Sequence, residues 1–169
     1  MDRNSVIVYY SWVGNTKLAA EEIQKSTGLE LFRIEEKKER NFGSIMGPAF
    51  AAFFGFKSGI KPIDFSFQKY ENVFIGTPVW AGKITPAINS FLSKYSLKGK
   101  NIYIFITKAD ENVPQKVIDS MTSRIEKKGG KVKGCISLTT KWDPKTNIPL
   151  FSEECSREIQ EWTKSITKS

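Results

Sequence analysis

The sequence contains no histidine and only two cysteines, Cys135 and Cys155. The absence of histidine excludes catalytic triads that depend on a histidine base. The two cysteines are far apart in the chain, so there is no Cys-x-x-Cys pair, and without histidine this argues against a zinc site. One cysteine falls in a strand-like run and the other on the apolar face of a predicted helix. We therefore expect both thiols to be reduced and buried in the core.

A long hydrophobic run is also missing. The longest apolar stretch outside the predicted strands is AFAAFFGF, from Ala49 to Phe56. This is far shorter than the ~20 residues that a membrane-spanning helix needs. The first residues, Met1 to Asn4, lead directly into a strand pattern without the apolar region of a signal peptide. These features predict a cytoplasmic protein with no membrane span.

The composition that remains is typical of a globular protein. Hydrophobic residues make up 40% of the chain and charged residues 26%, which are ordinary values for a folded domain. A chain of 169 residues can bury a substantial core and favours one domain over residues 1–169.

Short runs rich in β-branched and aromatic residues alternate with segments of helical periodicity. Several of these runs are almost continuously apolar, which is typical of strands covered on both faces in a parallel sheet. The alternation predicts a three-layer α/β sandwich, with helices on both faces of a five-stranded parallel sheet. It allows a doubly wound sheet, for which we expect the order 2-1-3-4-5. The predicted strands are Val6–Tyr10, Leu29–Ile34, Asn72–Ile75, Asn101–Ile106 and Val132–Leu138, and the predicted helices are Lys17–Ser26, Thr85–Tyr95, Val113–Lys128 and Ser152–Ile166. Asn112 is the candidate N-cap of the third helix, with Pro114 in its first turn.

Residues 37–62 interrupt this rhythm. The segment KKERNFGSIMGPAFAAFFGFKSGIKP contains four glycines, two prolines and five phenylalanines. It is an irregular insert for which three interpretations stay open: a short helix that packs on the core, an apolar lid near a ligand, or a self-association surface.

The first strand ends at the turn Ser-Trp-Val-Gly-Asn-Thr, residues 11–16, and a helix follows. The first N–H groups of a helix have no intrahelical acceptor and lie at the positive end of its dipole. Gly14 allows close approach of the backbone, Ser11 and Thr16 add hydroxyl donors, and Asn15 adds an amide. These groups can form a nest for a dianionic phosphate, although an ordinary capped turn explains the same residues. The patterns GxxxxGK[ST] and GxGxxG of other phosphate-binding loops are absent.

A second informative stretch, VFIGTPVWAG, covers Val73 to Gly82. A buried strand ends near Gly76, and we expect Trp80 to lie on the loop that follows. In a sheet of order 2-1-3-4-5 the first and third strands are neighbours at the switch point, so both loops should face one crevice. A phosphate nest beside a tryptophan suggests a flat aromatic ligand with a phosphate tail.

These two stretches resemble the flavodoxin family. Residues 11–16 are similar to its FMN phosphate loop, roughly [ST]-x-[ST]-G-N-T, and residues 76–82 (GTPVWAG) resemble the second flavin loop of the larger flavodoxin-like oxidoreductases. The resemblance implies a flavodoxin-like fold over essentially the whole chain and non-covalently bound FMN as cofactor. It implies that the first loop wraps the phosphate, that the second lines the isoalloxazine ring with Trp80 as stacking partner, and that a third loop after the fourth strand meets the pyrimidine edge. The cofactor-binding residues implied are Ser11, Trp12, Val13, Gly14, Asn15, Thr16, Thr77, Pro78, Val79, Trp80, Ala81, Gly82, Thr107, Lys108, Ala109 and Asp110.

The chain departs from the family pattern in three ways. Val13 stands where a hydroxyl residue is usual, which removes one donor from the phosphate loop. The third loop lacks the aromatic residue that often covers the second face of the flavin, so that face is open or is covered by Trp12, Trp142 or the insert. Lastly, the chain is basic, with a net charge of +8, whereas electron-carrier flavodoxins are usually acidic.

The function that the resemblance implies is electron transfer through FMN, as a carrier or as a small reductase of the NAD(P)H:quinone type. Its partner would be a redox protein, for which an acidic surface would suit this chain, or a small electron acceptor; a homodimer stays open. We expect no nucleic-acid partner and no catalytic side chain, because the flavin carries the chemistry. The basic cluster Arg124, Lys127, Lys128, Lys131 and Lys133 is either a solvated helix end or a docking face. A flavin-free interaction module that uses this face is the alternative.

Overall fold

The computed structural model describes residues 4–38, 57–63, 67–143, 145–146 and 148–167. Most of the predicted insert, residues 39–56, therefore lies outside the described residues. None of the helices in the described parts of the chain has the length and apolar character that a membrane crossing requires.

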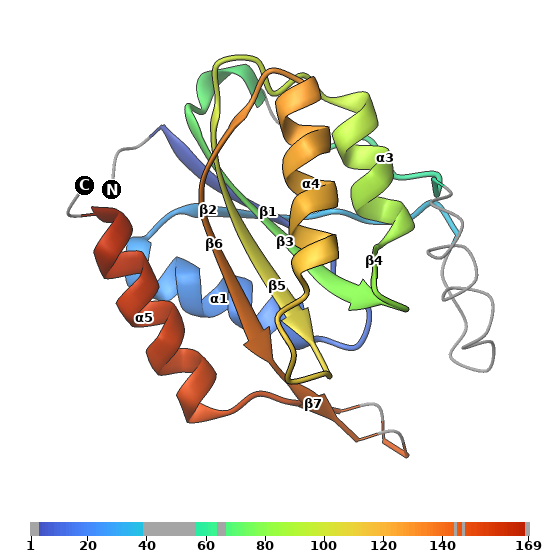
Figure 1. Cartoon of the computed structure of the whole chain (residues 1–169), viewed down its shortest axis with the longest axis vertical. Coiled ribbons are helices and arrows are strands. Elements are labelled where there is room, and N and C mark those ends of the chain that lie inside the picture. Colours follow the sequence, from blue (N-terminus) through green and yellow to red (C-terminus); the bar gives the residue numbers. More distant parts are fainter. Residues whose placement is uncertain (1–3, 39–56, 64–66, 144, 147, 168–169) are drawn as a thin grey trace.

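A parallel sheet forms the centre of the molecule (Figure 1). Its strand order is β2-β1-β3-β5-β6, and a two-residue strand, β4, pairs antiparallel with the end of β3. Because β5 and β6 are the fourth and fifth parallel strands along the chain, the predicted order 2-1-3-4-5 is confirmed. The strands are β1 (Ser5–Tyr9), β2 (Glu30–Arg33), β3 (Asn72–Trp80), β4 (Lys83–Ile84), β5 (Asn101–Lys108) and β6 (Lys131–Thr139), and a separate hairpin joins β7 (Lys141–Trp142) to β8 (Pro149–Leu150).

Helices cover both faces of the sheet, as predicted (Figure 1). Helices α1 and α5 lie on one face, and α3 and α4 lie on the other. The helices are α1 (Asn15–Thr27), α3 (Pro86–Lys94), α4 (Gln115–Lys127) and α5 (Glu153–Thr167), with a short 3-10 helix, η1 (Phe67–Lys69), before β3.

Alternation along each strand divides the core between the two faces. In β1, Val6 and Val8 belong to the cluster under α3 and α4, whereas Ile7 and Tyr9 belong to the cluster under α1 and α5. All four side chains are buried, because successive residues of a strand point to opposite faces and helices cover both. The sequence of β1 therefore reads as one continuous apolar run.

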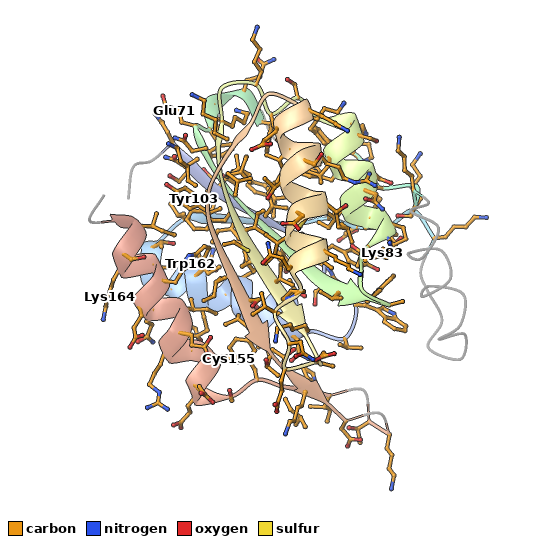
Figure 2. All side chains as sticks on the ribbon, in the orientation of Figure 1. Glu71, Lys83, Tyr103, Cys155, Trp162 and Lys164 are labelled. Carbon is orange, nitrogen blue, oxygen red and sulfur yellow. The ribbon has the colours of Figure 1, made fainter. Side chains whose placement is uncertain are left out.

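Aromatic side chains fill the face under α5. Figure 2 shows Trp162 on the side of α5 that faces the sheet, near Tyr103 of β5. The ring of Phe74 stacks on Tyr103 at 4.9 Å and meets Trp162 edge-on at 5.7 Å. Gly76 makes room on the same face, since a Cβ atom there would lie 2.1 Å from Cζ of Phe105.

The two cysteines are free thiols in the structure. Cys155 is buried and its thiol donates to the carbonyl oxygen of Thr139, with an S···O distance of 3.4 Å. Cys135 is half-buried, and burial raises the pKa of its thiol to about 11. The expectation that both are core residues is confirmed for Cys155 and holds in part for Cys135.

Two local predictions are wrong. Trp80 does not lie on a loop but is the last residue of β3, because the strand continues past Gly76 and pairs with β4. Asn112 does not cap α4, whose N-cap is Pro114. The backbone and side-chain N–H groups of Asn112 instead both donate to Oδ1 of Asp110, at 2.8 Å, so a local Asx turn competes with capping.

Candidate functional site

Three chain segments meet at the carboxyl ends of β1, β3 and β5 and enclose a cleft of about 150 Å³. Strands β1 and β3 are neighbours, as are β3 and β5, so residues 11–16, 78–80 and 107–109 come to one edge of the sheet. The lining residues are Ser11, Trp12, Val13, Asn15, Thr16, Pro78, Val79, Trp80, Thr107, Lys108, Ala109 and Thr140. All but Thr140 belong to the predicted set.

The remaining five predicted residues lie beside this cleft rather than in its lining. Gly14 and Thr77 are neighbours in the chain of residues that line it. Gly82 and Asp110 line a second cavity, of about 410 Å³, between the β3–β4 turn and the start of α4. Ala81 is exposed between Trp80 and Gly82.

The first segment presents backbone donors at the start of α1. The first intrahelical bond runs from the N–H of Leu18 to the carbonyl of Gly14, at 3.0 Å, so the N–H groups of Asn15, Thr16 and Lys17 precede the helical ladder. The N–H of Gly14 donates to Oγ of Ser11 at 3.2 Å, which leaves the Ser11 hydroxyl hydrogen available as a donor.

Gly14 is required by both its backbone and its surroundings. Its φ angle is 109°, in the left-handed region that residues with a Cβ rarely adopt. A Cβ atom at this position would lie 2.9 Å from Cγ of Pro149 in β8. The β7–β8 hairpin thus packs directly against the first loop.

Hydroxyl and amide groups join the first loop to the rest of the site. Oγ1 of Thr16 and Oγ1 of Thr107 are 2.7 Å apart and buried. One hydroxyl donates to the other, so one hydrogen of the pair remains for a further acceptor. Nδ2 of Asn15 donates to the carbonyl of Lys141 at 2.9 Å. Its Oδ1 is buried without a hydrogen-bond partner, which leaves an acceptor at the cleft for an O–H or N–H donor.

The second segment is a β-hairpin. Val79 pairs with Ile84 and Trp80 with Lys83, so Ala81 and Gly82 form a two-residue turn. Their φ angles are 47° and 68°, and positive φ at both positions is the mark of a type I′ turn. The turn therefore holds Trp80 on a paired strand, half-buried at the rim of the cleft.

An aromatic cluster stands at this rim. The ring of Trp80 meets Trp12 edge-on at 5.4 Å and Tyr10 edge-on at 5.8 Å. The Tyr10 hydroxyl donates to Oε2 of Glu36 at 2.7 Å, and Nη2 of Arg33 donates to the carbonyl of Ser11 at 3.1 Å. The first loop and the hairpin are thus in contact through their tryptophans.

Lys108 shapes the third segment. Its ammonium donates to the carbonyl oxygens of Asp110 (2.6 Å) and Glu111 (3.2 Å) and to Oγ1 of Thr139 (2.7 Å). These bonds fold the loop after β5 back on its own strand. The hydrogen bond from the backbone N–H of Asn112 holds the pKa of the Asp110 carboxyl below its ordinary value.

The polar groups that line the cleft are mainly uncharged hydrogen-bond donors. Among its lining residues, all within the described part of the chain, Lys108 alone is charged, and its ammonium bonds to the loop. An anion placed here would meet N–H and O–H dipoles and the positive end of α1 rather than a cationic side chain.

Sequence reasoning did not find several residues that hold the site. Thr140 follows β6, the carbonyl of Lys141 fixes Asn15, and Pro149 packs on Gly14. All three belong to a segment that no motif marks, and their proximity to the first loop depends on the path of the chain after β6. The side chain of Trp142 lies outside the described residues.

Comparison with known proteins places this geometry in a family. A family model described as Flavodoxin matches residues 57–142, just over half of the chain. No curated protein sequence gives a significant match.

Solved structures share the fold. A protein from Bacteroides eggerthii described as a flavoprotein superposes with a TM-score of 0.72 at 22% identity, over 86% of this chain and 94% of that one. A flavoprotein from Lactobacillus acidophilus, solved in complex with FMN, gives 0.64 at 24% identity, over 80% and 93%. Oxidised flavodoxin 1 from Bacillus cereus gives 0.56 at 16% identity, over 97% of each chain. The family match and the shared strand order lead to one conclusion: this chain belongs to the flavodoxin family.

Proposed function

We propose that the chain binds FMN non-covalently and transfers electrons through it, as a carrier or as a small reductase. The observation that carries the proposal is the convergence of three chain segments on one cleft, whose lining combines uncharged hydrogen-bond donors with two tryptophans. The Lactobacillus acidophilus flavoprotein, which shares the fold, was solved with FMN.

The first loop would hold the phosphate. Free N–H groups at the start of α1, the Ser11 hydroxyl and one hydrogen of the Thr16–Thr107 pair are donors that suit a dianion. The unpartnered Oδ1 of Asn15 accepts hydrogen bonds and suits a ribityl hydroxyl better than a phosphate oxygen. This assigns Asn15 a different role from the one expected from the sequence, since its N–H₂ group already donates to Lys141.

The ring needs more space than the first cleft offers. At about 150 Å³ it is smaller than the ~300 Å³ at which ligand sites usually begin. The neighbouring cavity of about 410 Å³ shares Val79 and Lys108 with it. We assign the phosphate and ribityl chain to the first cavity and the isoalloxazine to the region between the Trp80 hairpin and the loop after β5.

When bound, FMN supplies the one- or two-electron chemistry, and the protein supplies binding, orientation and the electrostatic environment. Trp80 would pack against the ring, and the backbone N–H groups of Ala109 and Asp110, which follow β5, would meet its polar edge. No side chain is assigned as acid or base.

Titration of FMN with the purified protein tests the proposal. We expect quenching of FMN fluorescence with saturation at one equivalent. Trp80→Ala should weaken binding by about 5- to 150-fold, the range expected when an aromatic stacking partner is lost, and Trp80→Phe should restore most of it. A colourless protein that leaves FMN fluorescence unchanged contradicts the proposal.

A second assay, the oxidation of NADH or NADPH in the presence of a quinone, then distinguishes a reductase from an electron carrier. Steady turnover with the FMN-loaded protein indicates a reductase, whereas reduction only by a second redox protein indicates a carrier.

The alternative, a flavin-free interaction module, is favoured by two observations. Trp12 and Trp80 are in edge contact across the rim, and Val13 supplies no hydroxyl to the loop. If the contact between Trp12 and Trp80 persists in the presence of excess FMN, that result supports the flavin-free function.

A further inference from the structure

A cluster of lysine side chains lies at the end of the sheet opposite the cleft. The loop between α3 and β5 and the loop between α4 and β6 run side by side, joined by three backbone hydrogen bonds. These run from the N–H of Leu97 to Lys128, from Gly99 to Gly129 and from Lys131 to Lys100, at 2.8–3.1 Å. The packing is tight, since a Cβ atom on Gly129 would lie 3.0 Å from Cα of Lys98.

The paired loops gather six lysines, which we call the paired-loop lysines: Lys94, Lys98, Lys100, Lys127, Lys128 and Lys131. All except Lys100 are exposed. In the described parts of the chain, no carboxylate lies within ion-pair distance of any of the six. The cluster includes three of the five residues that the sequence pointed to and adds Lys94, Lys98 and Lys100, which come from a different loop.

The dipoles of two helices offset part of the positive charge of the paired-loop lysines. Helices α3 and α4 both end here, at Lys94 and Lys127, and each C-terminus carries about half a negative charge. The ammonium of Lys128 donates to the carbonyl of Ser93 at 2.8 Å, at the end of α3. The two helix ends together offset about one of the six positive charges, and the Glu71 carboxylate, which acts on Lys100, offsets about one more. The rest of the positive charge has no carboxylate partner within ion-pair distance among the residues that the structure describes.

A groove of about 570 Å³ opens among these lysines. Lys94, Lys98 and Lys100 line it, and no carboxylate is among its lining residues in the part of the chain that the structure describes. Phe67 and Tyr95 form an aromatic wall, with the ammonium of Lys100 4.9 Å from the Phe67 ring centroid and that of Lys94 5.6 Å from the Tyr95 centroid.

Lys100 fixes the floor of the groove. Its ammonium donates to the carbonyls of Phe67 (2.8 Å) and Tyr70 (2.5 Å). Burial lowers its pKa, and the nearby Glu71 carboxylate opposes that shift. The carbonyl oxygens that accept from Lys100 carry no net charge, so positive charge remains at the groove that an incoming carboxylate can neutralise.

We propose that the paired-loop lysines and this groove dock an acidic segment of a partner protein. The proposal is independent of FMN binding. Strand β5 spans the distance between the two ends of the sheet, and its eight residues extend over ~23 Å. This exceeds the ~8 Å Debye length at physiological salt, so docking here leaves the cleft open and its electrostatics nearly unchanged.

A lipid surface fits the same charge less well. The groove is concave, and a flat membrane would not fill it. The exposed large apolar side chains of the described residues, Val113, Ile148 and Leu150, follow the carboxyl ends of β5 and β6 and cannot insert at this end. Nucleic acid fits less well because Phe67 is buried and Tyr95 is half-buried, so neither offers an open face for base stacking.

Fluorescence anisotropy with a fluorescein-labelled decaglutamate peptide tests the proposal. The test variant is Lys94→Gln/Lys98→Gln/Lys131→Gln. The matched control, Lys25→Gln/Lys145→Gln/Lys164→Gln, removes the same net charge from exposed lysines elsewhere; Figure 2 shows Lys164 pointing away from the body of the molecule. We expect the test variant to bind the peptide about tenfold or more weakly than the natural chain, and the control to stay within about twofold of it.

Equal weakening in both variants would attribute binding to net charge and overturn the proposal. The proposal is also overturned if the peptide does not bind the natural chain. The same conclusion holds if vesicles with phosphatidylserine, or duplex DNA, bind the natural chain and the peptide does not. Urea unfolding of each variant controls for folding. FMN titration of the test variant should match that of the natural chain, and because the peptide assay needs no FMN, failure of one proposal is distinguishable from failure of the other.

Discussion

Helix α1 has a left-handed glycine at each end, and this offers a matched test of the first loop. Gly14 precedes the helix with φ 109° and Gly28 follows it with φ 70°. A Cβ atom on Gly28 would meet nothing within 4 Å, whereas one on Gly14 would lie 2.9 Å from Cγ and 3.4 Å from Cβ of Pro149. Both alanine substitutions therefore place a Cβ atom at a positive φ angle, and only Gly14→Ala adds a packing contact.

The expected losses of stability follow from the backbone conformation at each glycine and from the contact with Pro149. Forcing a residue with a Cβ into a left-handed conformation costs about 1–2 kcal/mol, which is all that we expect for Gly28→Ala. Gly14→Ala adds overpacking against Pro149, about 1–3 kcal/mol more. To relieve the contact, either the β7–β8 hairpin or the first loop must move.

Movement of the first loop should weaken FMN binding. Loss of one charge-assisted hydrogen bond costs about 1.5–3 kcal/mol, which corresponds to a factor of about 10 to 150 in Kd. We therefore expect Gly14→Ala to be less stable than Gly28→Ala in urea unfolding of the apoprotein and to bind FMN at least about tenfold more weakly. Gly28→Ala should bind FMN like the natural chain.

The reasoning is refuted if the two variants are equally stable and bind FMN equally well. Equal stability with unequal affinity would mean that the Pro149 contact adds no cost and that a change in the first loop's own backbone lowers the affinity for FMN. The prediction about the Pro149 contact would then be wrong.

Three further predictions concern the rest of the molecule. Gly76→Ala should prevent stable folding, because its Cβ would lie 2.1 Å from Cζ of Phe105, and Phe105→Ala in the same chain should partly rescue the thermal transition; no rescue would locate the defect elsewhere. The Cys135 thiol, with a pKa raised to about 11 by burial, should react slowly with a disulfide reagent at neutral pH and faster as pH rises toward that value, and a rate equal to that of the urea-unfolded chain would contradict its burial. The Tyr70 hydroxyl, which donates to Glu30, lowers the pKa of that carboxyl below its ordinary value. The free energy of unfolding should therefore fall as pH drops below this value, and Tyr70→Phe should make the fall shallower in a pH series of urea titrations.

The main features of the fold could be predicted from the sequence because they depend on local patterns. The run Val6–Tyr9 is apolar at every position, which indicates a strand covered on both faces. Gly28 and Gly129 have left-handed φ angles just after α1 and α4, as expected for glycine at a helix end. The alternation of strands with helices and the right-handed crossover rule indicated a doubly wound parallel sheet, and the order 2-1-3-4-5 agreed with the resemblance to the flavodoxin family.

The candidate site was predictable only where a motif marks it. Eleven of the twelve residues that line the cleft were named from three short stretches, because these stretches end or follow parallel strands, whose carboxyl ends meet at one edge of the sheet. The motif did not show that Trp80 belongs to a hairpin. Trp80 belongs to the hairpin because the neighbouring Val79 pairs with Ile84. Whether a short segment forms a strand or a loop depends on such contacts with neighbouring chain, which a local motif does not show.

What the sequence determined by itself was the order of the elements, the burial of both sheet faces and the loops at the strand ends. The tertiary structure alone decided which distant groups share a site. Pro149 meets Gly14, Thr107 meets Thr16, and the lysines of two loops form one cluster. The physical reason is that propensity and periodicity act over a few neighbouring residues, whereas these contacts join segments tens of residues apart and form only when the whole core has packed.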